Sequence, residues 1–244
     1  MLQGQGVTKH FGGLTVLNGV DFVVHSGEVL GLIGPNGSGK TTLFNVISGF
    51  LKPDAGRLSL NGRRIDRMTP DRIARLGLGR TFQIVRPLAD LSLTDNTAIA
   101  ALYGARPVYT VKTARERARE VLDFCGLDDK RRRRPKDLGL VDLKRLEIAR
   151  ALAVGPRFLL LDEVFAGLTP SEIETAVRLT LRIRDRFEVA IFMVEHIMRA
   201  IMGACSRIMV LNYGVKIADG DPRDVASNPT VIEAYLGEGY ACSG

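Results

Sequence analysis

The sequence predicts an α/β protein: a mostly parallel sheet with flanking helices, an N-terminal antiparallel β subdomain and an inserted helical subdomain. Three observations support this fold class. Residues 1–65 are rich in strand patterns, residues 90–153 carry helical patterns, and short apolar strands alternate with amphipathic helices after residue 156. Strands that alternate with helices favour a parallel sheet whose faces those helices cover.

The N-terminal part carries three strand signals. Asn18–Val24 alternates apolar and polar residues, and Gly56–Leu60 runs into Asn61-Gly62, a dipeptide typical of tight hairpin turns. Between them, Glu28–Ile33 is a short apolar strand that leads directly into a glycine-rich segment. The chain is therefore expected to begin with antiparallel strands and then to enter the parallel sheet.

The glycine-rich segment, residues 34–41, reads Gly-Pro-Asn-Gly-Ser-Gly-Lys-Thr and matches the P-loop pattern. Backbone N–H groups of such a loop surround phosphates, and the helix predicted over residues 42–48 adds a partial positive charge. The lysine reaches the terminal phosphates, and the following threonine holds a magnesium ion. The residues expected to bind a nucleoside triphosphate here are Gly34, Asn36, Gly37, Ser38, Gly39, Lys40, Thr41 and Thr42.

Helices and buried strands are predicted in the rest of the chain. Thr113–Phe124 and Asp142–Ala153 each place apolar residues on one helical face. Beyond them, Arg157–Leu161 and Val189–Val194 are short apolar strands separated by the amphipathic helix Pro170–Asp185.

Two carboxylates follow the first of these strands, at the sheet edge where open α/β proteins bind ligands. Asp162 is expected to orient the magnesium shell, and Glu163 to position or deprotonate the attacking water as a general base. In many proteins an Asp-Glu pair at the end of an apolar run instead caps the helix that follows it. The P-loop about 120 residues earlier favours the catalytic interpretation.

Composition excludes several other classes of protein. The chain has 244 residues, of which 45% are hydrophobic and 25% charged, as in ordinary globular proteins. Its longest apolar stretch, Val189–Leu211, is interrupted by too many charges to span a membrane. Cys125, Cys205 and Cys242 have no zinc-like spacing and predict free thiols in a reducing cytosol. We therefore expect a protein that is soluble by itself.

The net charge of +7 is concentrated in part in the basic run Lys130–Lys136. This run is a solvated loop ended by Pro135, or it contacts anionic lipid or an acidic partner. A nucleic acid partner is disfavoured, because no aromatic residues are interleaved to stack on bases.

Together the motifs resemble the ATP-binding cassette (ABC) family of ATPases over nearly the whole chain, which implies ATP and Mg²⁺ as ligands. In that family an aromatic residue stacks on adenine, a role that falls to Phe11, with Val16 as its packing partner. The glutamine that senses the γ-phosphate matches Gln83, and the histidine that contacts it matches His196. The resemblance implies the catalytic residues Glu163, His196 and Gln83 and the metal residues Thr41, Gln83 and Asp162.

Several segments look like the branched-chain amino acid importer subgroup of that family: Phe11–Gly13, Gly79–Gln83, Ala166–Pro170 and Val231–Gly237. This resemblance implies a second cassette subunit and membrane permease subunits; a heterodimer is favoured over a homodimer, and both remain open. It also implies an indirect link to a substrate-binding protein and a peripheral place on the cytoplasmic face of the inner (plasma) membrane.

The resemblance also implies a single cassette domain over residues 1–244. Its nucleotide-binding core is expected at about 1–85 and 156–220, its helical subdomain at about 86–155, and a C-terminal tail at about 221–244. The region Arg80–Leu102 would form the groove that receives a permease helix.

One segment departs from the family. Cassettes hold each ATP between one P-loop and the partner's Leu-Ser-Gly-Gly-Gln signature, but here those positions read Leu138-Gly139-Leu140-Val141-Asp142. Gly139 lacks the serine hydroxyl, whose hydrogen bond to a charged group is worth roughly 1.5–3 kcal/mol. Leu140 and Val141 restrict the approach of the backbone. Asp142 would cap its own helix and place negative charge near the phosphate. We hypothesise a weak signature half beside an intact P-loop half.

Transport coupling is thus the leading interpretation, with import favoured over export. A regulatory subunit that binds ATP without turnover is the alternative that the altered signature favours. A soluble cassette ATPase that acts on ribosomes or DNA is a further alternative, although such proteins usually carry two cassettes or long coiled coils.

Overall fold

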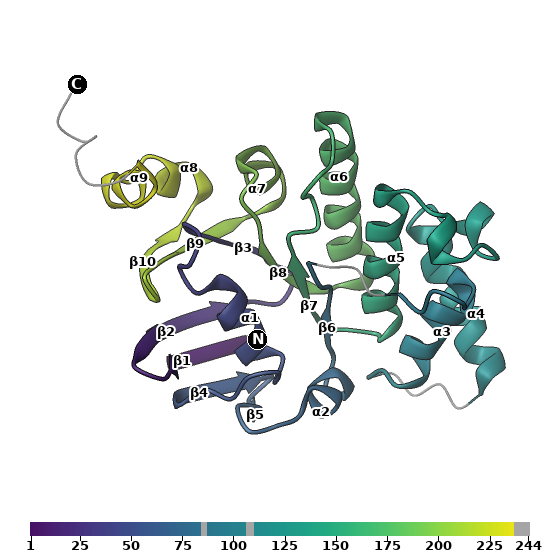
Figure 1. Cartoon of the computed structure of the whole chain (residues 1–244), viewed down its shortest axis with the longest axis horizontal. Helices are drawn as coiled ribbons and strands as arrows, with labels where there is room; N and C mark the ends of the chain where they lie inside the picture. Colours follow the sequence, from purple (N-terminus) through teal and green to yellow (C-terminus); the bar gives the residue numbers. More distant parts are fainter. Residues whose placement is uncertain (84–86, 106–109, 237–244) are drawn as a thin grey trace.

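The computed structural model describes residues 1–83, 87–105 and 110–236, and within these ranges the strands form two sheets (Figure 1). The smaller sheet is antiparallel, with strand order β2-β1-β4-β5. The larger has the order β10-β9-β3-β8-β7-β6, in which only the pair β10–β9 is antiparallel. The strands are β1 (Leu2–Phe11), β2 (Leu14–Val24), β3 (Val29–Ile33), β4 (Ala55–Leu60), β5 (Arg63–Arg64), β6 (Leu78–Arg80), β7 (Phe158–Asp162), β8 (Ala190–Val194), β9 (Arg207–Asn212) and β10 (Val215–Gly220).

Helices cover the larger sheet and form a separate layer at one end of the molecule (Figure 1). They are α1 (Lys40–Ile47), α2 (Pro70–Arg75), α3 (Leu93–Leu102), α4 (Val111–Phe124), α5 (Leu140–Ala153), α6 (Pro170–Phe187), α7 (Met198–Ala204), α8 (Pro222–Ala226) and α9 (Pro229–Leu236). Two short 3₁₀ turns, η1 (Asp128–Lys130) and η2 (Pro135–Asp137), connect α4 to α5. None of the helices in the described residues has both the length and the apolar composition needed to cross a membrane.

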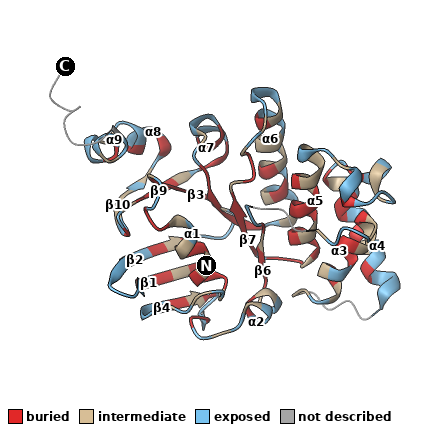
Figure 2. Cartoon of the chain, in the orientation of Figure 1, coloured by how far each residue is buried: buried red, intermediate tan, exposed pale blue. Residues whose placement is uncertain are grey.

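The central strands β3, β7 and β8 of the larger sheet are buried on both faces, because their alternate side chains pack against different layers (Figure 2). In β7, Phe158 and Leu160 join the core formed with α1 and the antiparallel sheet. Their neighbours Leu159 and Leu161 join the core formed with α5, α6 and α7. The wholly apolar strands seen in the sequence follow from this double burial.

The predicted fold class is confirmed, including the antiparallel N-terminal sheet. The hairpin turn lies at Asn61 and Gly62, with φ of 50° and 79°, as an Asn-Gly turn requires. The helices expected from Thr42, Thr113 and Asp142 begin two residues earlier, at Lys40, Val111 and Leu140. Predictions that concern residues 84–86 and 237–244 lie outside the described residues, among them Cys242 and the end of the C-terminal tail.

The helical layer is held together by small side chains. Ala98 and Ala101 of α3, Ala114 and Ala118 of α4 and Ala153 of α5 form one buried cluster. Because alanine adds little volume, the three helices can approach closely. This layer carries the signature segment at the start of α5, whereas the P-loop lies between β3 and α1.

Candidate functional site

The P-loop is seated between β2 and β9 by glycines that no other residue could replace. At Gly34, with φ of 150°, an added Cβ would lie 2.0 Å from the carbonyl oxygen of Leu211. At Gly39, with φ of 103°, it would lie 2.8 Å from the carbonyl oxygen of Val16. Gly37 has φ of 80° with open space around it. The loop therefore needs glycine both for its backbone angles and for its close contact with neighbouring strands.

Lys40 closes over the loop. Its Nζ donates hydrogen bonds to the carbonyl oxygens of Gly34, at 2.7 Å, and Pro35, at 2.8 Å. Burial lowers the pKa of Lys40, and the negative charge of Glu163 partly offsets this. Phosphate oxygens could replace the two carbonyls as acceptors. The other predicted loop residues differ in exposure: Ser38 is buried, Thr42 is half-buried, and Asn36 and Thr41 are exposed.

All three predicted metal residues line one cavity of about 460 Å³ beside α1. Its lining residues are Thr41, Asn45, Phe50, Arg80, Phe82, Gln83, Glu147, Arg150 and Asp162. Mg²⁺ is usually bound by one or two carboxylates together with substrate phosphates. The hydroxyl, amide and carboxylate oxygens of Thr41, Gln83 and Asp162 suit this arrangement. Among the described residues, no group of three or more His, Cys, Asp or Glu could hold a metal ion without a nucleotide.

Arg80 ties Asp162 to the P-loop helix. Its Nη2 lies 3.0 Å from Asp162 Oδ2, and the two side chains are only 7% and 5% exposed. Its Nη1 donates to Ser48 Oγ at 2.6 Å, to Asn45 Oδ1 at 2.9 Å and to the Phe44 carbonyl oxygen at 3.2 Å. Burial raises the pKa of Asp162, and the neighbouring Arg80 guanidinium counteracts this. One guanidinium thus joins β6, β7 and α1.

Glu163 is held by contacts on three sides. Its backbone adopts φ of 48°, an uncommon angle for a residue with a Cβ, and its N–H donates to Val194 O at 3.0 Å. Gln83 Nε2 donates to Glu163 Oε2 at 2.6 Å, and Lys144 Nζ donates to the Glu163 carbonyl oxygen at 3.1 Å. The two predicted catalytic residues Gln83 and Glu163 are therefore in direct contact.

Sequence reasoning missed two buried ionisable residues that are electrostatically coupled to Glu163, namely Glu195 and Lys144. Glu195 is 1% exposed, and its Oε1 accepts a hydrogen bond from Phe165 N at 2.9 Å. Its Oε2 has no hydrogen-bond partner among the described residues. Burial raises the pKa of Glu195 to about 7, while Lys144 opposes the shift. Burial also lowers the pKa of Lys144, opposed by Glu195 and Glu163. No motif flagged these two residues, because they are far apart in the sequence and are coupled only in the folded chain.

The structure places Phe11 and His196 at the surface. Phe11 ends β1, is 47% exposed, and has Lys9 Nζ 5.6 Å from its ring centroid. His196 is exposed and follows β8, whose Val194 pairs with Asp162. Neither lines the cavity beside α1. The structure thus brings together the P-loop, Gln83, Asp162 and Glu163, whereas Phe11 and His196 are exposed and lie outside this cavity.

The signature segment lies at the start of α5. Gly139 precedes the helix with φ of −75°, and an added Cβ there would meet no atom within 4 Å. Leu140 is 48% exposed. Its side chain lies close to Gly167 in the loop after Glu163, because a Cβ added at Gly167 would be 3.0 Å from Leu140 Cδ2. Leu138 and Val141 are half-buried.

The expectation that Asp142 caps its own helix is wrong. No side chain caps α5, and Asp142 is its third residue rather than its cap. The Asp142 carboxylate is instead occupied by cations: Lys130 Nζ lies 2.7 Å from Oδ2, and Arg145 Nη1 lies 3.7 Å from Oδ1. Lys130 belongs to the basic run, so at least this member of the run is not simply solvated.

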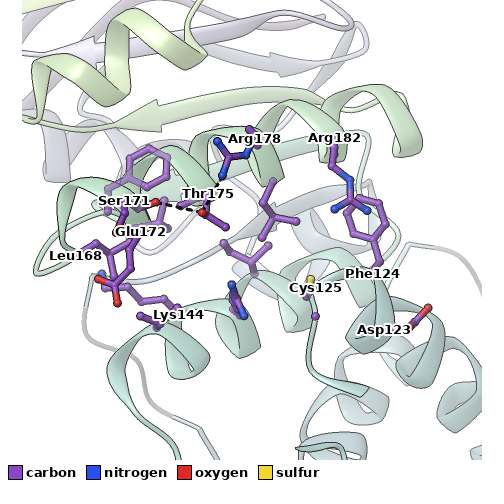
Figure 3. Close-up of a pocket in the computed structure, with 18 residues that line it drawn as sticks. Asp123, Phe124, Cys125, Lys144, Leu168, Ser171, Glu172, Thr175, Arg178 and Arg182 are labelled. Carbon is purple, nitrogen blue, oxygen red and sulfur yellow. Dashed lines mark hydrogen bonds between the residues drawn. The ribbon is translucent and has the colours of Figure 1, made fainter. Parts of the chain in front are cut away.

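A second cavity, of about 550 Å³, lies between α5, α6 and the end of α4 (Figure 3). Figure 3 shows Lys144 and Leu168 at one end, and Phe124 and Cys125 at the other. The Arg182 guanidinium lies 4.8 Å from the Phe124 ring centroid, and burial raises the pKa of the Cys125 thiol to about 12. Val141 is the single predicted site residue on its lining, so this cavity is separate from the P-loop.

Comparison with known families gives two matches. Residues 17–166 match the model described as ABC transporter, and residues 215–241 match the model described as Branched-chain amino acid ATP-binding cassette transporter. The first match includes the P-loop, the signature position and Asp162-Glu163. The second lies in the C-terminal region.

Individual relatives are similar over nearly their whole length. The chain is 37% identical to the high-affinity branched-chain amino acid transport ATP-binding protein LivG of Salmonella typhimurium, over 98% of each chain. It is equally similar to BraF of Pseudomonas aeruginosa, again 37% over 98% of each. A solved ATP-binding cassette of an ABC transporter in its ADP conformation is 30% identical, with a TM-score of 0.87 over 98% of this chain and 99% of that one.

We predict that Arg80→Ala destabilises the protein strongly, because it leaves the buried carboxylate of Asp162 without its cation. Breaking one partner of a buried pair costs about 3–5 kcal/mol. Urea unfolding would measure the loss. Arg115→Ala is the control, because its pair with Asp95 is solvent-exposed and should contribute less than about 1 kcal/mol. Equal losses in the two variants would show that the Arg80–Asp162 pair has no special structural role.

We predict that Glu195→Gln changes the pH dependence of stability. The pKa of Glu195 is about 7 in the folded protein, above its ordinary 4.5. Between these values the folded state binds a proton that the unfolded state lacks, so stability falls as pH rises. Glutamine keeps the acceptor for Phe165 N–H without the charge. As the pH rises from 4.5 to 8, the free energy of unfolding of the variant should increase relative to that of wild type by roughly 2–3 kcal/mol. Parallel pH profiles in urea unfolding would contradict this.

Proposed function

The chain belongs to the ABC transporter family and is an ATPase of that family, and on this basis we propose the following function. It powers a membrane importer for branched-chain amino acids or related small polar solutes. The names of LivG and BraF and the C-terminal match at residues 215–241 support this substrate class. The observation that carries the proposal is the convergence of Thr41, Gln83 and Asp162 on one cavity beside the P-loop, with Gln83 bonded to Glu163.

In this proposal ATP binds along the P-loop. The glycine-rich backbone and Lys40 hold the phosphates, and the exposed ring of Phe11 stacks on adenine with Val16 beneath it. Thr41, Gln83 and Asp162 would hold Mg²⁺, which would neutralise charge on the transferred phosphate. Asp162 is already fixed by Arg80, so its carboxylate keeps one orientation before the nucleotide arrives.

Hydrolysis then depends on Glu163. Its carboxylate orients the attacking water and accepts a proton from it, while His196 contacts the γ-phosphate. Gln83 holds the Glu163 carboxylate, and Lys144 holds its backbone carbonyl. Because Lys144 belongs to α5, the helical layer is linked directly to the catalytic glutamate. Movement of that layer would therefore alter the position of Glu163.

We further propose that the chain works with a second cassette subunit, in a heterodimer. The P-loop half of this chain is complete, whereas the signature half lacks the serine hydroxyl and both glycines. A partner with an ordinary signature would complete the P-loop site of this chain. The opposite site, completed by Leu138–Asp142, would be the weaker one.

A permease helix would dock beside Gln83, which places the chain peripherally on the cytoplasmic face of the inner (plasma) membrane. Phe50 and Phe82 are 55% and 40% exposed, with ring centroids 5.6 Å apart. Both rings line the cavity with Gln83. Exposed aromatic side chains of this kind anchor protein interfaces. The permeases in turn would link the cassette to a substrate-binding protein.

We predict that Glu163→Gln lowers steady-state ATP hydrolysis about 100-fold or more, because an amide cannot act as general base. ATP binding should persist, so the variant should accumulate as an ATP-bound dimer in size-exclusion chromatography. Glu120→Gln, on the exposed face of α4, is the matched control and should leave hydrolysis unchanged. Hydrolysis by Glu163→Gln at the wild-type rate would exclude Glu163 as the base.

We predict that Gly139→Ser strengthens ATP-driven dimerisation. The backbone angle accepts serine, no atom obstructs its Cβ, and the regained hydroxyl can donate to a phosphate. A bond of roughly 1.5–3 kcal/mol corresponds to about a tenfold or greater fall in the ATP concentration for half-dimerisation. Gly220→Ser in β10 is the control, with only ordinary contact at its Cβ. An unchanged ATP dependence would mean that the signature is not limited by the missing hydroxyl.

A further inference from the structure

The carboxylate of Asp142 is neutralised within the chain. It lies in the first turn of α5, 16% exposed, and Lys130 Nζ is 2.7 Å from its Oδ2. Arg145 is more distant, at 3.7 Å from Oδ1. The first backbone N–H groups of α5 precede the helical hydrogen bonds, which begin with Leu143 N donating to Gly139 O at 3.0 Å. Lys130 therefore neutralises a negative charge that lies beside the first backbone N–H groups of α5.

Lys130 is held in place by the segment that carries it. Its N–H donates to Leu127 O at 3.1 Å, within η1. The next residues are fixed to α3, because Arg131 O accepts from Thr94 N and Arg133 O accepts from Leu93 N, each at 3.0 Å. Arg131 is paired with Asp128. The basic run is thus anchored at its start, and of its side chains Lys130 is the one that pairs with Asp142.

We propose that Lys130 is a positioning residue for the signature segment, an inference that rests on the proposed ATP-driven dimer. A free carboxylate at the start of α5 would repel the phosphates of a nucleotide held by the partner, where the helix end itself attracts anions. By pairing with Asp142, Lys130 keeps that end electropositive. The segment can then receive phosphate although it lacks the serine hydroxyl and both glycines.

The charge pair is tested by a double-mutant cycle in the Glu163→Gln chain, which stabilises the ATP-bound dimer. Lys130→Ala, Asp142→Asn and the double variant are compared by the ATP concentration at half-dimerisation. The chain is assayed alone and with a co-expressed second cassette. Lys130→Ala should raise that concentration about tenfold, as expected for an uncompensated charge near a phosphate. Asp142→Asn should not raise it, and the double variant should behave like Asp142→Asn.

A separate readout distinguishes positioning from a structural role. ATP affinity of the monomer, measured with a fluorescent ATP analogue, reports the chain's own P-loop and should stay within about twofold in every variant. Lys136→Ala, an exposed lysine of the same run, is the matched control and should dimerise like the parent.

Two results would overturn the inference. One is normal dimerisation of Lys130→Ala. The other is a double variant as impaired as Lys130→Ala, since Lys130 would then act without Asp142. Failure of the proposed function is visible separately, in the Glu163→Gln parent: if it does not dimerise with ATP in either pairing, the dimer and the inference that rests on it are both wrong.

Discussion

The buried ion pair between Arg80 and Asp162 organises the nucleotide-binding half of this cassette. Burying two charges is costly unless geometry and further hydrogen bonds compensate, and here Arg80 also donates to three oxygens at α1. The segment after Arg80 is clamped to β7, because Thr81 N donates to Leu160 O and Thr81 Oγ1 accepts from Asp162 N. These hydrogen bonds fix the segment so that Gln83 Nε2 donates a hydrogen bond to Glu163 Oε2. The residues proposed to hold Mg²⁺ and the proposed catalytic residues Gln83 and Glu163 are thus positioned by one element pair, β6 and β7, and by the helix that follows the P-loop.

In the proposed dimer this chain contributes a P-loop half to one ATP site and a signature half to the other, and the two halves are built in different ways. The P-loop half depends on shape, since Gly34 and Gly39 lie where any Cβ would collide with a neighbouring strand. The signature half depends on charge, since Gly139 and Asp142 supply neither the hydroxyl nor the amide of the family pattern, and Lys130 offsets the carboxylate. An interaction based on charge is screened by salt, whereas a fitted backbone cradle is not. The signature half is therefore expected to be the more sensitive to ionic strength.

Local patterns in the sequence predicted the local features of the structure. The P-loop, the Asn61-Gly62 turn and the apolar strand before Asp162 each depend on a few adjacent residues, and each lies where expected. The role of Arg80 could not be predicted, because it meets Asp162 across 82 positions of the chain. The electrostatic coupling of Lys144 and Glu195 is hidden for the same reason. Asp142 was expected to cap a helix that starts at that residue, whereas α5 starts at Leu140 and the Asp142 carboxylate pairs with Lys130.

The proposed inequality of the two halves is tested most directly by vanadate trapping of a photoreactive, radiolabelled ATP in the proposed dimer of this chain with a second cassette. Vanadate retains ADP at the P-loop that has just hydrolysed ATP, so the labelled chain identifies the active site. The account predicts that the label is found predominantly on this chain, whose P-loop is completed by the partner's signature. Equal labelling of both chains, or strong labelling of a homodimer of this chain, would contradict it.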